Sequence, residues 1–149
     1  MRVLIDADGC PVINESIKIS KEFHIECIIL CDTSHYFERD GATTITVSKG
    51  ADSADFALVN MVHKGDIVIT QDYGLAAMCM AKSAIPISQN GMVYHNGSID
   101  ALLLQRHTAK KIRIAGGRLK GSPKRTNEQN EIFEIKLREL VVKLMNEFK

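Results

Sequence analysis

Near its start the chain reads VLIDADGCP over residues 3–11. Three apolar residues lead into two acids and a turn that contains Gly9 and Pro11, which is the pattern of a buried strand that ends at a loop. From Val12 to Phe23 the apolar residues recur at roughly helical spacing, and Pro11 suits a first helical turn. The stretch therefore predicts a strand followed directly by a helix.

The same alternation of strand and helix continues along the chain. Strands are predicted at residues 25–30, 43–47, 67–70 and 85–87, and helices at residues 53–63 and 75–82. Short strands that alternate with helices form βαβ units, whose right-handed crossovers give a parallel sheet. We therefore predict an α/β fold, a doubly wound parallel sheet of about five strands with helices on both faces. Weaker patterns at residues 92–94 and 99–107 suggest a further strand and a further helix.

The last part of the chain predicts a single long helix over residues 127–148. Thr126 can cap it, with Gln129 three residues further on, and one apolar stripe from Phe133 to Phe148 follows. Such a stripe covers a core or pairs two copies, so a homodimer is an open alternative. A chain of 149 residues is about one domain in length, and residues 1–149 are expected to form a single domain.

Membrane and secreted classes do not fit this sequence. No apolar run approaches the roughly 20 residues needed to span a bilayer, and the apolar run before Asp6 is too short for a signal peptide. The cysteines form no CxxC pair, which argues against a zinc site. Cys10 is expected to be a small residue in a tight turn rather than a nucleophile. We expect a cytoplasmic protein.

Charge is distributed unevenly along the chain, although its net value is only +1. Residues 1–100 carry 7 Lys and Arg against 13 Asp and Glu, whereas residues 101–127 carry 8 against none. A basic, glycine-rich loop is predicted at residues 115–125. Such a segment either balances the acidic body as a solvated loop or binds the phosphates of a nucleic acid, RNA being favoured. The residues proposed for phosphate binding are Lys49, Arg113, Gly116, Gly117, Arg118, Lys120, Lys124 and Arg125.

Acidic residues follow two of the predicted strands. Asp6 and Asp8 end the first strand, and Asp72 follows the strand at residues 67–70. In a doubly wound order of the flavodoxin type these two strands are expected to be neighbours, and ligands bind beyond the carboxyl ends of such strands. Asp52 and Asp55 lie three residues apart at the start of the intervening helix and could share one face. The five carboxylates are therefore expected to converge.

Converging carboxylates repel one another, so a cation among them is expected. Carboxylate and water ligands suit Mg²⁺ or Mn²⁺, and two such ions can activate water for phosphodiester cleavage. We expect Asp6, Asp55 and Asp72 to be the catalytic metal ligands, with Asp8 and Asp52 assisting. The competing interpretation is that these residues are helix caps and turn formers, which are common roles of Asp.

Three stretches resemble the motifs of the PIN-like nuclease superfamily. VLID at residues 3–6, SADFAL at residues 53–58 and TQDYGL at residues 70–75 match its Asp after strand one, its Asp in the helix before strand four, and its T-x-D-x-x-L stretch. KGAD at residues 49–52 is similar to the K-G-x-D entry of the related NYN nucleases, so Asp52 and Asp55 compete for one role. The resemblance implies a metal-dependent nuclease.

A closer resemblance is to the YaiI/YqxD family of uncharacterised bacterial proteins, and it spans nearly the whole chain. It rests on DADGCPV at residues 6–12, SAD at 53–55, TQD at 70–72 and GRLKGSP at 117–123. That family is known mainly as a PIN-like fold of unknown activity. The sequence departs from many PIN nucleases in one respect, because the acids between strands one and four that could complete the site, Glu22, Glu38 and Asp40, have no recognisable motif around them.

Two alternatives to a nuclease remain. DADG at residues 6–9 also resembles the D-x-D-G-T motif of haloacid dehalogenase-like phosphatases, with Asp6 as nucleophile and Asp8 as general acid, although Cys10 breaks the match. The later motifs of that superfamily are reduced to Lys82 and Asp72. The second alternative is a catalytically inactive PIN-like protein that binds RNA without cleaving it.

Overall fold

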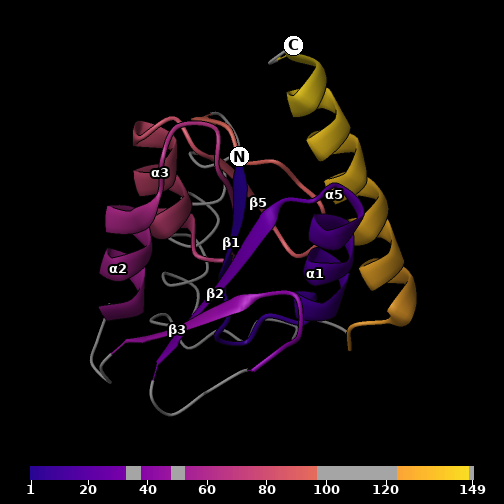
Figure 1. Cartoon of the computed structure of the whole chain (residues 1–149), viewed down its shortest axis with the longest axis horizontal. Coiled ribbons are helices and arrows are strands. Elements are labelled where there is room, and N and C mark those ends of the chain that lie inside the picture. Colours follow the sequence, from indigo (N-terminus) through magenta and orange to yellow (C-terminus); the bar gives the residue numbers. More distant parts are fainter. Residues whose placement is uncertain (33–37, 48–52, 97–123, 148–149) are drawn as a thin grey trace, which may run out of the picture.

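A computed structural model describes residues 1–32, 38–47, 53–96 and 124–147. The described residues form a parallel sheet with strand order β3-β2-β1-β4-β5 (Figure 1). Helices cover both faces, which confirms the predicted doubly wound α/β fold with a C-terminal helix. The strands are β1 (Arg2–Asp6), β2 (Glu26–Asp32), β3 (Thr43–Val47), β4 (Ile67–Ile69) and β5 (Ile85–Ile87); the helices are α1 (Ile13–Glu22), α2 (Ser53–Met61), α3 (Tyr73–Ala81) and α5 (Asn127–Glu147).

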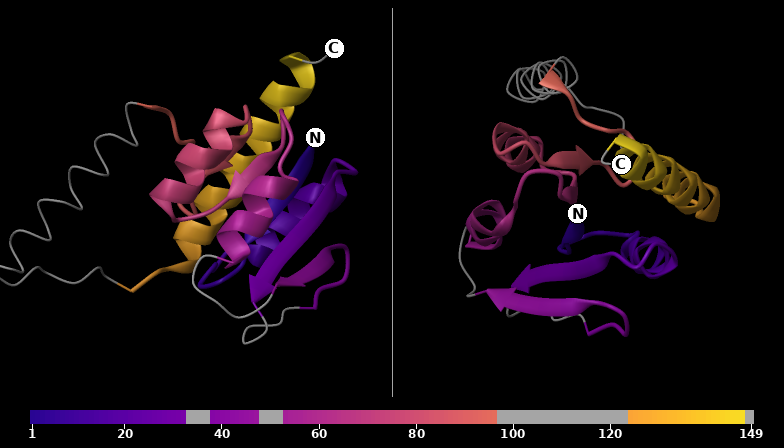
Figure 2. Two further views of the ribbon diagram at one scale, coloured as in Figure 1. Left: turned by 90° about the vertical axis from the view of Figure 1, so that its left-hand side faces the viewer. Right: turned by 45° about the horizontal axis from the view of Figure 1, so that its top comes forward.

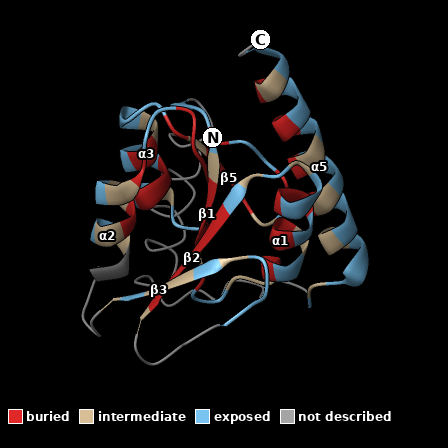
Figure 3. Ribbon diagram, viewed as in Figure 1, coloured by how far each residue is buried: buried red, intermediate tan, exposed pale blue. Residues whose placement is uncertain are grey.

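Side chains of the central strands alternate between two cores. Val3 and Ile5 of β1 pack with α1 and α5, whereas Leu4 between them packs with α2 and α3. Figure 2 shows these two pairs of helices on opposite sides of the sheet. The central strands β1 and β4 between them are largely buried (Figure 3). This alternation follows from the period of two along a strand, and burial on both faces explains why β1 and β4 read as continuous apolar runs.

The strand order confirms one part of the sequence prediction and corrects another. β1 and β4 are parallel neighbours, with Ile5 opposite Ile69. The order is not of the flavodoxin type, however, because β3 lies at the edge beyond β2 rather than beside β1. The composition of β3 explains its place: three of its five residues are threonine and none is fully buried, which suits an edge strand.

The segment after β5 differs from the predicted strand at residues 92–94. It forms an isolated antiparallel bridge between Val93 and Ile87. The Ser88 N–H donates to the Met92 carbonyl (2.8 Å) and the Tyr94 N–H donates to the Pro86 carbonyl (2.9 Å). The segment therefore covers the outer edge of β5. The helix predicted at residues 99–107 and most of the basic loop, up to residue 123, lie outside the described residues.

Helix α5 begins as predicted, with Thr126 and Gln129 forming a reciprocal cap. The Thr126 N–H donates to Gln129 Oε1 (2.8 Å), and the Gln129 N–H donates to Thr126 Oγ1 (3.4 Å). Its apolar stripe, including Phe133 and Leu137, is buried in the core shared with α1. The described part of that stripe therefore belongs to the core. Within the described part of the chain, no helix is long and apolar enough to cross a membrane.

Candidate functional site

The hydroxyl of Thr70 joins two of the predicted acids at the carboxyl edge of the sheet. Thr70 Oγ1 donates to Asp6 Oδ2 (2.9 Å) and accepts from the Asp72 N–H (3.0 Å). Thr70 is 3% exposed, and its own N–H donates to the Ile87 carbonyl of β5 (3.1 Å). Pairing of β1 with β4 thus brings Asp6 beside the turn that carries Asp72. This arrangement confirms the predicted approach of the two residues.

Asp72 is also the N-cap of α3. Its Oδ1 accepts from the N–H groups of Gly74 (2.8 Å) and Leu75 (3.1 Å). The capping interpretation of this residue is therefore correct, and it explains why α3 begins at Tyr73 rather than at residue 75. Among the described residues the other oxygen, Oδ2, has no hydrogen-bond donor, and the side chain is exposed. Capping leaves one oxygen of Asp72 for a ligand.

Asp6 is half-buried, and its carboxyl group has an elevated pKa. Burial is the main cause, and the negative charges of Asp72 and Asp8 raise the pKa further, while the hydrogen bond from Thr70 lowers it. The charges of Asp72 and Asp8 therefore oppose ionisation of Asp6. Such repulsion is what a bound cation would relieve.

Asp55 lies in the first turn of α2 and is half-buried. Burial raises the pKa of the Cys79 thiol to about 11, and the carboxylates of Asp55 and Asp6 add to this rise against the opposing charge of Lys82. Both carboxylates are therefore within electrostatic reach of one buried sulfur. Asp52, the competitor of Asp55, lies outside the described residues.

The fit of these residues to a divalent ion is partial. In the described part of the chain, no three His, Cys, Asp or Glu side chains stand close enough to hold one ion together. Mg²⁺ usually keeps several waters and takes only one or two carboxylates from the protein. Asp6 and Asp72 supply two such carboxylates, and the raised pKa of Asp6 gives the pair a reason to bind a cation. The donor chemistry therefore fits Mg²⁺ or Mn²⁺.

Arg125, predicted to bind phosphate, has a structural role. Its Nε donates to Asn130 Oδ1 (2.6 Å), Nη1 donates to Asn90 Oδ1 (2.7 Å) and Nη2 donates to the Gln89 carbonyl (2.6 Å). The guanidinium therefore ties the start of α5 to the loop after β5. Lys124 beside it is exposed. The remaining predicted phosphate ligands, Lys49, Arg113, Gly116, Gly117, Arg118 and Lys120, lie outside the described residues.

Glu15 is an acid near this edge that the sequence motifs do not single out. It lies in the first turn of α1, and its buried Oε2 has no hydrogen-bond partner among the residues that the structure describes. Burial raises the pKa of the Cys10 thiol to about 11, and the carboxylates of Asp6 and Glu15 add to the rise. The feature of the sequence that could have pointed to Glu15 is its position shortly after the DADGCP turn that carries Asp6 and Asp8. A thiol with such a pKa is not a nucleophile at neutral pH, which supports the structural interpretation of Cys10.

Comparison with known proteins supplies a family. The sequence profile described as "Uncharacterized BCR, YaiI/YqxD family" matches residues 4–143. A UPF0178 protein of Exiguobacterium sibiricum is 52% identical over 134 residues, which cover 90% of this chain and 92% of that relative. A UPF0178 protein of Clostridium acetobutylicum is 43% identical over 145 residues, covering 96% of this chain and 98% of that relative. No solved structure gives a significant match.

Proposed function

This chain belongs to the YaiI/YqxD family of uncharacterised proteins, and we propose that it is a divalent-metal-dependent nuclease of PIN-like fold that hydrolyses phosphodiester bonds in RNA. The observation that carries the proposal is the Asp6–Thr70–Asp72 arrangement where β1 and β4 meet. This is the edge of an open α/β sheet where ligand sites are built. The family description itself assigns no activity.

Each acid has a proposed part in the reaction. Asp6 and Asp72 would be the main ligands of Mg²⁺ or Mn²⁺, Asp55 would complete the catalytic set, and Asp8 and Asp52 would assist. When bound, the ion supplies an activated water and stabilises charge on the phosphate. The Thr70 hydroxyl holds the Asp6 carboxylate and the backbone of Asp72 in one orientation.

The PIN-like part of the proposal is supported by where the acids lie on the elements. Asp6 ends β1, Asp55 lies in the helix before β4, and Asp72 follows β4 within TQDYGL. This is the order in the pattern that the sequence resembles. RNA as the partner is supported by the basic segment at residues 101–127, which has no acid. The four cysteines are free thiols, which supports a reducing compartment such as the cytoplasm.

Of the two alternatives, RNA binding without cleavage has the stronger support. The described residues hold no ready group of three metal ligands, and a protein that only binds RNA needs none. The phosphatase alternative is weaker because of where Lys82 lies. It is the C-cap of α3, at the opposite end of that helix from Asp72, and its Nζ donates to the Val59 carbonyl (2.6 Å).

The proposal is tested by metal titration and an RNA cleavage assay. Calorimetry with Mn²⁺ is expected to show binding by the unmodified chain and its loss in Asp6→Asn/Asp72→Asn. Asp40, which the sequence left as a possible further ligand, is fully exposed and pairs instead with Lys21 in the last turn of α1 (3.4 Å), so Asp40→Asn is the matched control and is expected to bind like the unmodified chain. Single-stranded RNA should be cleaved by the unmodified chain and by Asp40→Asn, but not by Asp6→Asn/Asp72→Asn. Equal Mn²⁺ binding by all three proteins would contradict the proposed centre, and RNA bound but uncut would support the binding alternative.

A further inference from the structure

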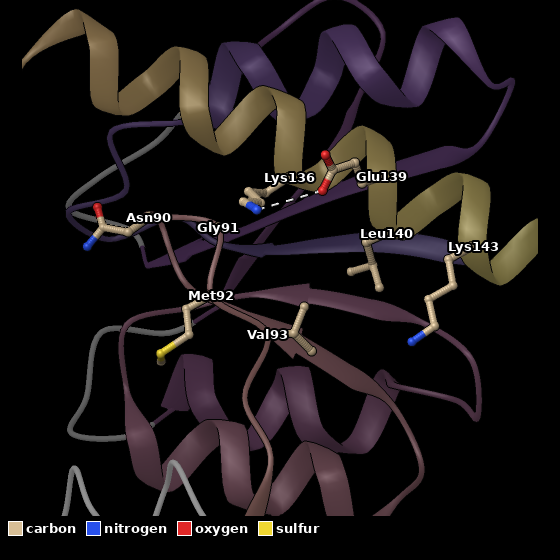
Figure 4. Close-up of a pocket in the computed structure, with 8 residues that line it drawn as sticks. All are labelled: Asn90, Gly91, Met92, Val93, Lys136, Glu139, Leu140 and Lys143. Carbon is tan, nitrogen blue, oxygen red and sulfur yellow. Dashed lines mark ion pairs between the residues drawn. The ribbon is translucent and has the colours of Figure 1, made fainter.

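A groove runs between α5 and the segment that covers β5 (Figure 4). Its volume is about 570 Å³, and we call it the α5 groove. It lies on the side of α5 away from α1 and opens to solvent. Its lining residues are Asn90, Gly91, Met92, Val93, Lys136, Glu139, Leu140 and Lys143.

The walls of the α5 groove combine apolar and cationic side chains. Met92 is 40% exposed and Val93 is 38% exposed, and Figure 4 shows Val93 across from Leu140. Lys136 pairs with Glu139 at 3.8 Å. Lys143 extends from α5 across the groove and forms no ion pair within the described part of the chain. An apolar floor with cations beside it suits a ligand that carries flat apolar groups on an anionic backbone.

The α5 groove starts at the edge of the sheet that carries the acids. Asn90 forms one end of the groove, and its Oδ1 accepts a hydrogen bond from Arg125 Nη1. The charge of Arg125 in turn acts on the Cys10 thiol, as does that of Asp6. From this edge α5 runs back along the molecule toward the amino ends of the strands (Figure 1). Lys136 and Lys143 are seven residues apart, or about 10 Å along the helix axis. Two cations therefore follow the path that leads away from the acids.

We propose that the α5 groove binds a single strand of nucleic acid leading away from the proposed catalytic edge, with phosphates at Lys136 and Lys143 and bases against Met92 and Val93. The assignment rests on the proposed function for its substrate class. A groove between one helix and one extended segment accepts one strand rather than a duplex. Lysine contacts to phosphate do not depend on sequence, so the groove would add affinity for longer strands without base preference.

Binding is tested by fluorescence anisotropy with a labelled oligouridine of about twelve nucleotides, a length within known single-strand site sizes, in EDTA so that no cleavage occurs. Lys136→Gln/Lys143→Gln is expected to weaken binding several-fold and to reduce the slope of log affinity against log salt by about 1.4, because each phosphate contact to a single strand contributes about 0.7. Glu139→Gln is expected to strengthen binding, since it removes the acid in the groove. The matched control is Lys21→Gln/Lys64→Gln, which removes two exposed lysines from the amino edge and should leave the affinity unchanged.

A second readout separates the groove from the catalytic proposal. Hydrolysis of bis(p-nitrophenyl) phosphate, which is too small to extend from the acids along α5, should be the same in Lys136→Gln/Lys143→Gln as in the unmodified chain. Unchanged oligouridine binding by this variant overturns the α5 groove and leaves the nuclease proposal standing. If oligouridine binding depends on Lys136 and Lys143 but neither RNA nor bis(p-nitrophenyl) phosphate is hydrolysed, the groove is supported and the nuclease proposal is overturned. If Met92→Glu halves the molecular mass measured by light scattering and leaves oligouridine binding unchanged, the groove binds a second copy of the chain instead.

Discussion

Asp6 is the residue at which stability and the proposed function oppose each other. It is the last residue of β1, directly after three buried residues, and both its burial and the nearby charges of Asp72 and Asp8 disfavour its ionised form. Thr70 offsets part of that cost with one hydrogen bond. A residue placed only for stability at this position would be uncharged. A carboxylate at this position is what a ligand-binding role would require.

Replacing Asp6 with Asn is expected to stabilise the metal-free protein at neutral pH. Folding raises the pKa of Asp6, so the ionised carboxylate destabilises the folded state above that raised pKa, and the penalty disappears as the pH falls below the ordinary value of 3.8. Asp6→Asn should therefore melt about 3 °C higher at pH 7, on the order of 1 kcal/mol for a chain of this size. The difference should shrink toward zero near pH 4. Thermal unfolding in EDTA across this pH range measures it.

Added Mn²⁺ is expected to reverse the order of the melting temperatures of the unmodified chain and Asp6→Asn. A ligand that binds the folded state raises its stability, so saturating Mn²⁺ should raise the melting temperature of the unmodified chain and not that of Asp6→Asn. The control is Asp40→Asn, which should behave like the unmodified chain at every pH. A melting temperature for Asp6→Asn below that of the unmodified chain at pH 7 in EDTA would show that the carboxylate stabilises the fold.

At the scale of elements, one glycine sets how closely α5 approaches the sheet. Gly91 has φ +83°, and a Cβ at this position would lie 2.6 Å from both Cβ and Cγ of Lys136. The Cβ of a helical residue cannot move without the helix. The loop after β5 can therefore pack on α5 only because residue 91 has no side chain, and Arg125 fastens the same loop to the start of α5.

Gly91→Ala is expected to destabilise the protein more than Gly9→Ala. Both positions have positive φ, but a Cβ at Gly9 would meet nothing within 4 Å. The conformational cost of about 1 to 2 kcal/mol applies to both substitutions, whereas the overlap with Lys136 adds about 1 to 3 kcal/mol to Gly91→Ala alone. Urea unfolding of the two variants measures the difference. Equal losses of stability would mean that α5 shifts to accommodate the methyl group at no cost.

At the scale of the whole molecule, the two cores enclose the thiols. Cys27 packs in the core beneath α1 and α5, and Cys79 packs in the core beneath α2 and α3. Burial raises the pKa of each of these thiols, and that of Cys10, to about 11. A thiol with such a pKa is almost wholly protonated at pH 8, and the thiolate is the reactive form.

Reaction with a disulfide reagent therefore reports on the integrity of both cores. At pH 8 the folded chain is expected to react with 5,5′-dithiobis(2-nitrobenzoate) at least about tenfold more slowly at Cys10, Cys27 and Cys79 than the same chain in guanidinium, where thiol pKa values return to about 8.5. Single Cys→Ser variants identify each site by mass spectrometry. Fast modification of Cys27 or Cys79 in the folded chain would show that its core opens readily.

Local patterns in the sequence were enough to predict the elements and the order of the acids along them. Apolar runs buried on both faces and the breaks after them are local patterns, so β1, β3 and the cap of α5 were predicted at or near their observed bounds. The motifs VLID and TQDYGL likewise marked Asp6 and Asp72 as residues at strand ends. Such features depend on a few residues that are adjacent in the chain, so they can be recognised without knowing the fold.

The order of the strands in the sheet and the hydrogen-bond partners of the polar side chains could not be predicted from local sequence patterns. The place of β3 at the edge, the bridging hydroxyl of Thr70 and the buried oxygen of Glu15 depend on contacts between residues far apart in the chain. The same holds for Arg125, which the sequence suggested for phosphate and the fold uses to hold α5. The partners of a charged side chain depend on which residues the tertiary packing places near it, and that packing depends on the whole chain.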